Sequence, residues 1–516
     1  MTPWEFIFAI LIVYRLRRVF SSPICPLFPA PDSCYNERNY ETTEVFPMIN
    51  TNALGTYLNG WAEKKNLAGV SACILGPDGP VYEWTYGVRD AKGTPVDMDT
   101  MFGIASMSKS ITSLCVCILE TEGKLSLNDP VCKWIPGFSV PGQPKEAVTL
   151  RHLMMHTAGI PPMEPLEWSI AINSPGRDDS EWAQAMRKSS PNRMDKIEHI
   201  VDYIAACPYH TLGAPGEVFS YSNEGYAVLS YVVDAAAGMP LEQFMHERVF
   251  APLGMTRSIL DNGFEAALAL SGGNLTSLFE MNDGVRECDD DWSILPPFRG
   301  CAMVKSTARD MAAYYRAISA YGMHEGVQAI PRRAIELLVG KYHPLTELNV
   351  MCCGLNKREK CGRVICEHSG GLHGVSTKGG LLLDENYGFA VLCNQGDEDM
   401  DELMWGLYNA VMGLPLEESH MWFIPEGRPF PEPEMIVGKY IDHEGTPSLL
   451  TIWEEDGKLV GLRDDSPFDV AWCGGTRFIA LNKETGEYRF RIEFFVRDGK
   501  AWGVRRGTRV SERLEA

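Results

Sequence analysis

A serine and a lysine three positions apart have the types and spacing that suit covalent chemistry. Ser106 and Lys109 would share one face of a helix beginning there, because side chains at i and i+3 are neighbours on a helix. A serine hydroxyl attacks a carbonyl carbon when an adjacent base takes its proton, and an amine does so when its pKa is lowered. The chain continues apolar through 114–119, so we expect Ser106 at the start of a buried helix.

A second segment places a phenol and an amide two residues apart, just before a predicted helix over 226–237. The phenol of Tyr221, held near a lysine ammonium, would be drawn towards phenolate and could shuttle protons. The Asn223 amide could bond both the lysine and a substrate carbonyl. Tyr221 taken alone also fits a buried tyrosine whose hydroxyl has a structural partner.

A third segment is rich in glycine. His368, Ser369, Gly370 and Gly371 follow one another in the chain. A glycine-rich strand edge lets a substrate lie against the backbone, where a free N–H completes an oxyanion hole.

Metal binding is the alternative chemistry that the sequence allows. His152 and His156 are spaced i, i+4, but the glutamate of H-E-x-x-H is missing and no third ligand is evident. The cysteines at 352, 353, 361 and 366 contain no C-x-x-C spacing. We therefore predict no metal and no cofactor, and we expect the segment 149–159 to be a helix that packs beside the site and ends at Gly159.

Composition excludes several other classes of function. The chain has 516 residues, a net charge of -21 and no basic block, which argues against a nucleic-acid partner bound through its phosphates. The 15 cysteines are scattered and odd in number, unlike the disulfide framework of a small secreted domain.

The N-terminus contains a short apolar run over 6–14, followed by arginines at 15, 17 and 18. This run is too short to span a bilayer comfortably, and a secretory signal carries its positive charge first. We interpret residues 1–20 as a weak membrane anchor or interfacial helix, with an atypical signal peptide as the alternative. An intracellular or membrane-tethered location is favoured over secretion, and the oligomeric state stays open.

The remaining patterns predict four parts: an apolar leader over 1–40, a catalytic domain over 41–422, a Pro-rich linker over 423–434 and a C-terminal β domain over 435–516. The polar stretch 173–195 is expected to be an inserted lid. Helices between separated groups of antiparallel strands indicate an α+β catalytic domain. The tail predicts a small antiparallel barrel or sandwich and contains no cluster that suggests catalysis.

Individual elements follow from periodicity and turn residues. The sequence predicts helices over 51–65, 226–237 and 241–250, and strands over 69–75, 81–87, 379–383, 388–394, 448–453, 458–462, 477–481, 488–496 and 501–504.

Together the three motif segments resemble the serine β-lactamase and penicillin-binding-protein superfamily, in particular its class C β-lactamase-like and esterase branch. The motifs are S-x-x-K at 106–109, Y-x-N at 221–223 and H-S-G at 368–370, in the order that this branch has them. The resemblance spans roughly 51–414, and the tail looks like the lipocalin-like β domain of some members. It implies a β-lactamase-like antiparallel sheet with a helical domain, followed by a small all-β domain.

The resemblance also implies roles for the residues. Ser106 would be the acylated nucleophile, Lys109 its base partner and Tyr221 the proton shuttle to the leaving group. Asn223 would orient Lys109 and the substrate. The backbone N–H groups of Ser106 and Gly371 would form the oxyanion hole, with His368 and Ser369 lining the strand edge.

The histidine at 368 departs from the β-lactamase pattern, where a lysine would offer a permanent charge to the carboxylate of a β-lactam. Histidine is mostly neutral at pH 7, which favours a neutral ester or thioester. We therefore expect an esterase, thioesterase or transesterase acting on a small-molecule acyl substrate, such as one of secondary metabolism. A β-lactamase or D-amino-acid peptidase, a noncatalytic binding protein of the same fold, and metal-dependent hydrolysis at His152 and His156 are the alternatives.

Overall fold

The computed structural model describes residues 49–174, 180–340, 342–345 and 349–514. The expected leader over 1–40 lies outside these ranges. Within them, no helix is both long enough and apolar enough to cross a membrane.

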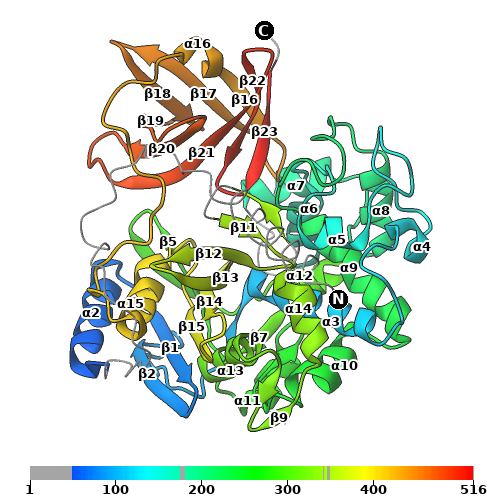
Figure 1. The fold of residues 1–516 in the computed structure, drawn as a ribbon, viewed down its shortest axis with the longest axis vertical. Helices are drawn as coiled ribbons and strands as arrows, with labels where there is room; N and C mark the ends of the chain where they lie inside the picture. The colour runs from blue at the N-terminus through cyan, green and yellow to red at the C-terminus, as the bar shows by residue number, and fades with distance from the viewer. Residues whose placement is uncertain (1–48, 175–179, 341, 346–348, 515–516) are drawn as a thin grey trace, which may run out of the picture. The chain divides into compact units, whose positions relative to one another are not determined.

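A mixed helical and antiparallel β domain comes first (Figure 1). Its main sheet has eight strands in the order β10-β11-β12-β13-β14-β15-β1-β2, and all neighbours are antiparallel. The strands are β1 (Gly69–Gly76), β2 (Gly79–Gly87), β10 (His343–Pro344), β11 (Asn349–Met351), β12 (Asn356–Lys360), β13 (Arg363–Leu372), β14 (Val375–Leu382) and β15 (Tyr387–Cys393).

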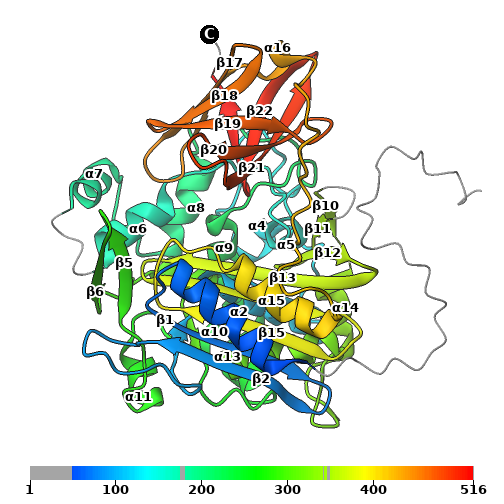
Figure 2. The same ribbon diagram turned by 90° about the vertical axis from the view of Figure 1, so that its left-hand side faces the viewer.

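Both faces of this sheet are covered, which explains why β14 and β15 are buried at every residue. Helices α2 (Thr51–Lys64) and α15 (Asp401–Met412) lie across one face (Figure 2). There Leu58, Phe389 and Leu403 share one apolar cluster. Helix α13 (Ala308–Ser319) packs against β1, β14 and β15.

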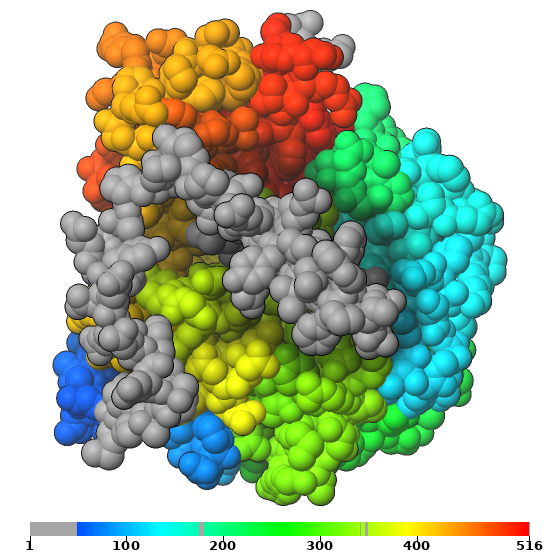
Figure 3. All heavy atoms as spheres, in the orientation of Figure 1, coloured from blue at the N-terminus to red at the C-terminus, as the bar shows by residue number. Residues whose placement is uncertain are grey.

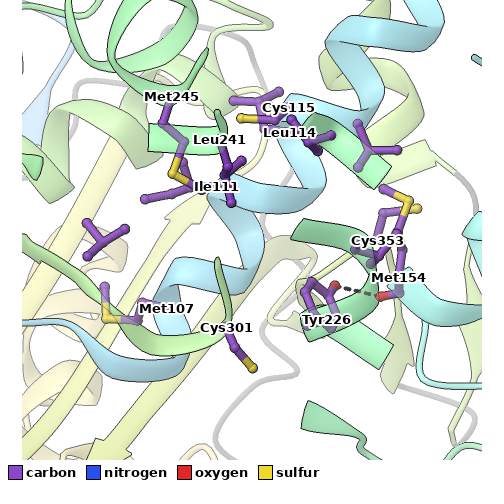
Figure 4. Close-up of a cluster of buried hydrophobic side chains, with 14 of the residues drawn as sticks. Met107, Ile111, Leu114, Cys115, Met154, Tyr226, Leu241, Met245, Cys301 and Cys353 are labelled. Atoms are coloured by element: carbon purple, nitrogen blue, oxygen red, sulfur yellow. Dashed lines mark hydrogen bonds between the residues drawn. The ribbon is translucent and has the colours of Figure 1, made fainter. Parts of the chain in front are cut away.

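The helical region is built around α3 (Ser108–Thr121), which is buried from Ser108 to Leu119 and packs against α9 and α14. Figure 4 shows Met107, Ile111 and Met245 in the apolar cluster around it. The Tyr226 hydroxyl donates to the Met154 carbonyl at 2.8 Å. The other helices are α4 (Val131–Trp134), α5 (Leu150–Met154), α6 (Pro165–Asn173), α7 (Glu181–Ser189), α8 (Ile197–Ala205), α9 (Asn223–Ala237), α10 (Leu241–Met245), α11 (Glu265–Ser271), α12 (Arg299–Ala302) and α14 (Arg332–Gly340).

Short strands complete this domain. A three-stranded sheet joins β3 (Phe102–Gly103), β7 (Val304–Ser306) and β4 (Ile259–Leu260) just ahead of the serine turn. Two hairpins pair β5 (Leu278–Asn282) with β6 (Val285–Asp289) and β8 (Met323–His324) with β9 (Val327–Gln328).

The C-terminal domain is a closed antiparallel barrel of eight strands. Its strands are β16 (Gly438–Asp442), β17 (Ser448–Glu455), β18 (Lys458–Arg463), β19 (Ser466–Trp472), β20 (Arg477–Asn482), β21 (Tyr488–Arg497), β22 (Lys500–Arg506) and β23 (Arg509–Arg513), preceded by the short α16 (Pro433–Ile436). Tyr440, Phe468, Phe478 and Phe494 are buried in one cluster, so side chains fill the barrel. In Figure 3 the red barrel residues meet the green residues of the helical region directly.

The predicted fold class is confirmed: a β-lactamase-like mixed domain followed by a small all-β domain. The structure corrects several elements. The predicted helix over 241–250 is α10 followed by a π-helical turn, His246–Phe250. The helix predicted to end at Gly159 ends at Met154, because His156 adopts a left-handed backbone conformation with φ of 57°. Strands β16, β19 and β23 of the barrel were not predicted.

Candidate active site

Ser106 sits in a single 3-10 turn, Ala105–Met107, between β3 and the start of α3. Two bonds to Ile104 fix the approach: its N–H donates to the Val304 carbonyl at 3.0 Å, and its carbonyl accepts from Thr377 Oγ1 at 3.1 Å. Ala105 has a φ of 43°, a conformation that costs an alanine energy and that is concentrated at functional sites. Neighbouring strands therefore hold the serine in a strained turn.

The side chain of Lys109 reaches back to this serine from the first turn of α3. Lys109 is fully buried, and its Nζ donates to Ser106 Oγ at 3.0 Å and to the Cys301 carbonyl at 3.1 Å. The same Nζ lies 4.9 Å from the centroid of the Tyr221 ring. The structure thus brings together the serine, the lysine and the tyrosine that the sequence singled out.

The charge of Lys109 differs from the expectation of a neutral amine. Burial pulls the pKa of Lys109 down, but the interactions with Cys301 and Tyr221 outweigh it, so the pKa lies above its ordinary value. Lys109 is therefore an ammonium in the resting site. In that form Lys109 Nζ donates a hydrogen bond to Ser106 Oγ and places a positive charge beside the Tyr221 ring.

Tyr221 is held by backbone bonds on the segment that leads into α9. Its N–H donates to the Thr508 carbonyl of the barrel at 2.9 Å. The ring of His156 stacks on the Tyr221 ring with a centroid distance of 4.2 Å. Ser222, the N-cap of α9, donates its backbone N–H to His156 Nδ1 at 3.0 Å.

The stacking on Tyr221 and the hydrogen bond from Ser222 give His156 a structural role, whereas its spacing from His152 had suggested a metal ligand. Burial holds the pKa of His156 well below its usual range, with Lys109 as a further cause, so the ring is neutral. The other histidine of the pair, His152, has its Nδ1 within 3.2 Å of the Thr149 hydroxyl and backbone nitrogen. In the part of the chain that the structure describes, no group of three or more acidic, histidine or cysteine side chains could hold a metal ion.

Asn223 is the first residue of α9 and its carboxamide has two neighbours. Its Nδ2 donates to Oε1 of Glu444, a barrel residue, at 3.2 Å. Its Oδ1 accepts a weak bond from Cys301 Sγ at 3.5 Å. The role predicted for Asn223 in orienting Lys109 stays a prediction.

The glycine-rich segment forms the end of β13. Strand β12 pairs with β13 only as far as Glu367, so that His368 and the residues after it form an edge. Space is tight at Gly370, where a Cβ atom would lie 2.3 Å from the Ile104 carbonyl oxygen, and open at Gly371, where it would meet nothing within 4 Å. The tight contact presses this edge against the serine turn.

His368 is half-buried at this edge, and its Nδ1 donates to the Ser369 carbonyl at 2.5 Å. Burial lowers the pKa of His368 to about 4, with a further contribution from the charge of Lys109. The ring is therefore neutral at pH 7, as the sequence led us to expect.

These residues surround a cavity of about 1960 Å³. Six predicted residues line it, namely Ser106, Tyr221, Asn223, His368, Ser369 and Gly371. Lys109 and Gly370 are buried behind this lining.

Among the other residues that line the cavity, sequence reasoning missed Cys301, Glu444 and Arg509, which contact the predicted ones. Cys301 carries no motif, and the two barrel residues come from a tail in which the sequence showed no catalytic cluster. Only the folding of the barrel against Tyr221 and Asn223 brings them to the site.

Comparison with known families agrees with this geometry. A family model described as Beta-lactamase matches residues 55–411, most of the chain, and includes the serine, tyrosine and histidine segments. The protein belongs to the β-lactamase family.

Two curated relatives are similar over part of their length. Penicillin-binding protein 4* of Bacillus subtilis (strain 168) is 29% identical over 210 residues, which cover 40% of this chain and 41% of the relative. Esterase EstB of Burkholderia gladioli is 29% identical over 207 residues, covering 40% of this chain and 49% of the relative. The chain thus spans less than half the length of these two relatives.

Two solved structures share the fold over 90% of this chain. SurE has a TM-score of 0.65 at 21% identity and is covered to 99%. The octameric penicillin-binding protein homologue from Pyrococcus abyssi has a TM-score of 0.62 at 19% identity and is covered to 100%.

Proposed function

We propose that the protein is a serine hydrolase or acyltransferase that works through an acyl-enzyme at Ser106. The observation that carries this proposal is the 3.0 Å contact between Lys109 Nζ and Ser106 Oγ, beside Tyr221 and on the wall of a large cavity. The similarity to an esterase and to a penicillin-binding protein supports the same chemistry.

Ser106 Oγ attacks the carbonyl carbon of the substrate, and its proton passes to the Lys109–Tyr221 pair. The step starts from a Tyr221 phenolate beside the Lys109 ammonium, so that Tyr221 accepts the proton and becomes a phenol. The carbonyl oxygen becomes an oxyanion, which the backbone N–H groups of Ser106 and Gly371 stabilise.

The tetrahedral intermediate collapses when the bond to the leaving oxygen or sulfur breaks. Tyr221 returns the proton to that atom, and the acyl group stays on Ser106 Oγ. Water or an alcohol then attacks the acyl carbon and gives its proton to Tyr221, and the released Ser106 Oγ takes a proton back. The products are the free acid with water and a new ester with an alcohol.

The substrate is an ester or thioester of a small molecule. The neutral His368 offers no permanent cation at the strand edge for the carboxylate of a β-lactam. The cavity is larger than the roughly 300–1,000 Å³ typical of drug-sized ligands, so it has room for both an acyl group and an acceptor.

A substrate panel tests this proposal. We would measure turnover of p-nitrophenyl esters of varied chain length, acyl thioesters and nitrocefin, each with and without alcohol acceptors, for the wild type and Ser106→Ala. We expect ester or thioester turnover in the wild type only, with Ser106→Ala folded but inactive. Faster cleavage of nitrocefin than of any ester would overturn the substrate class, and unchanged ester turnover in Ser106→Ala would overturn the mechanism.

A further inference from the structure

The barrel contacts the catalytic residues through two of its turns. One is the loop over 443–447 between β16 and β17, and the other is the turn over 507–508 between β22 and β23. The Thr508 carbonyl accepts from the Tyr221 N–H at 2.9 Å, and the Val510 N–H donates to Ser220 Oγ at 3.3 Å. The backbone on both sides of the Y-x-N motif is therefore tied to the barrel.

The loop over 443–447 also packs closely against the mixed domain. The ring of His443 stacks on that of Tyr209 at 3.7 Å between centroids and 6° between planes. At Gly445, whose φ is 71°, a Cβ atom would lie 2.7 Å from Glu167 Cγ. These close contacts fix the position of the intervening residue, Glu444.

Glu444 determines which end of the Asn223 carboxamide faces the serine and the lysine. A carboxylate only accepts hydrogen bonds, so the group 3.2 Å from Glu444 Oε1 must be the Nδ2 amine of Asn223. The Oδ1 end is then directed to the other side, towards Cys301 Sγ at 3.5 Å. Cys301 contacts the lysine as well, because its backbone carbonyl accepts from Lys109 Nζ at 3.1 Å. The Oδ1 end of Asn223 therefore faces the side on which Lys109 lies.

Arg509 completes the arrangement. Its guanidinium pairs with Glu444 at 2.5 Å, which neutralises the carboxylate beside the site. The same guanidinium lies 4.5 Å from the centroid of the Tyr221 ring. One ion pair of the barrel thus contacts both polar residues of the Y-x-N motif.

We propose that Glu444 and Arg509 are positioning residues for acyl transfer at Ser106, so that the barrel contributes residues to the active site. Glu444 fixes the Asn223 carboxamide with its oxygen towards Lys109, and Arg509 holds Glu444 and packs over Tyr221. This role rests on the proposed function. Because misplacement by about 1 Å can cost about a hundredfold in rate, the effect falls on kcat.

The test compares Glu444→Ala and Glu444→Gln with Asp464→Ala. Asp464 is a matched control, because it is a barrel carboxylate that accepts from Ser448 Oγ at 2.7 Å and from the Leu449 N–H at 3.2 Å, and it does not line the cavity. For each variant we would measure kcat and KM on the best ester of the panel, together with the thermal unfolding midpoint.

We expect Glu444→Ala to lose about tenfold or more in kcat with KM changed less than about threefold. Glu444→Gln keeps an acceptor oxygen for Asn223 and should recover most of kcat. Asp464→Ala should lower the unfolding midpoint and leave kcat of the folded protein unchanged.

Unchanged kcat in Glu444→Ala would overturn this proposal while leaving the proposed function standing. Equal losses in Glu444→Ala and Asp464→Ala that follow the unfolding midpoints would also overturn it, because they would show a stability effect only. A wild type with no turnover of any ester or thioester would overturn the proposed function and this proposal with it.

Discussion

Two lysines of this chain are buried to nearly the same extent, and their surroundings give them opposite pKa shifts. Burial lowers the pKa of Lys305 to about 8, and the charges of Asp261 and Glu265 offset this effect only in part. Burial acts on Lys109 too, but Cys301 and Tyr221 raise its pKa above the ordinary value. Only the second arrangement places a charged amine against a serine.

Replacing each lysine in turn separates chemistry from packing. Lys109→Met removes the amine at 3.0 Å from Ser106 Oγ, and we expect kcat/KM for ester hydrolysis to fall by about 10²- to 10⁴-fold, the range of general acid–base contributions. Lys305→Met is the matched control, which should change stability and leave kcat/KM nearly unaltered. Equal activity of the two variants in a p-nitrophenyl ester assay would contradict the role of Lys109.

The sequence predicted Ser106 and Lys109 because an i, i+3 pair is visible locally. It could not predict the charge of Lys109, because Cys301, whose side chain helps to raise its pKa, lies 192 residues further along the chain. The sequence also could not predict the stacking of His156 on Tyr221. This contact depends on the left-handed backbone conformation of His156, for which the sequence contains no motif.

At the scale of elements, the first turn of α9 carries an unusual carboxyl. Burial raises the pKa of Glu224 to about 7, and Ser222 Oγ donates to its Oε2 at 3.0 Å. The unfolded chain has a lower pKa, so the folded protein binds the additional proton between pH 4.5 and about 7. Stability from this group is present at low pH and is lost as pH rises through that window.

Glu224→Gln should therefore stabilise the protein more at pH 8 than at pH 5. From the pKa shift, the difference in the free energy of unfolding between the two pH values is about 3 kcal/mol at most. Thermal unfolding midpoints of the variant and the wild type at both pH values measure it. A stabilisation of the same size at both would contradict the raised pKa.

The contact between β13 and the serine turn should tolerate no added methyl group. Gly370→Ala would place Cβ 2.3 Å from the Ile104 carbonyl oxygen, and we expect a loss of ester turnover of about tenfold or more. Gly60→Ala in α2 is the control, because nothing lies within 4 Å of its Cβ, and it should stabilise the helix by about 0.5–1 kcal/mol. Full activity in Gly370→Ala would show that β13 can move away from Ser106 freely.

Elements with strong local patterns were predictable, and those defined by distant partners were not. The β1–β2 hairpin and α2 followed from a turn sequence and a helical period. In β19, Pro467 and Asp469 mask the strand pattern, and pairing with β18 and β20 across the barrel defines it instead. The helix over 149–159 ended early because contacts with Ser222 hold His156 out of helical geometry.

At the scale of the whole molecule, the barrel and the mixed domain share one site. The sequence predicted a separate all-β tail, either a small antiparallel barrel or a sandwich, since its alternating strands and turns are local. It could not predict that residues such as Glu444 and Arg509 line the cavity. The way in which one folded domain packs against another depends on residues from many separate segments.

The stability of the barrel should therefore control activity. Phe478 is fully buried in the barrel, and Phe478→Ala is expected to cost about 3–5 kcal/mol. On heating, ester hydrolysis in this variant should be lost together with the onset of proteolysis within 438–513, at a lower temperature than in the wild type. Full activity after the barrel has become cleavable would contradict a shared site.

The most direct test of the account is whether Ser106 becomes covalently modified. We would treat the full chain with a fluorophosphonate probe and locate the adduct by peptide mass spectrometry, with Ser106→Ala and Lys109→Met alongside. We expect an adduct on Ser106 in the wild type, none in Ser106→Ala and strongly slowed labelling in Lys109→Met. A wild type without an adduct on Ser106, or Ser106→Ala that still hydrolyses esters, would contradict it.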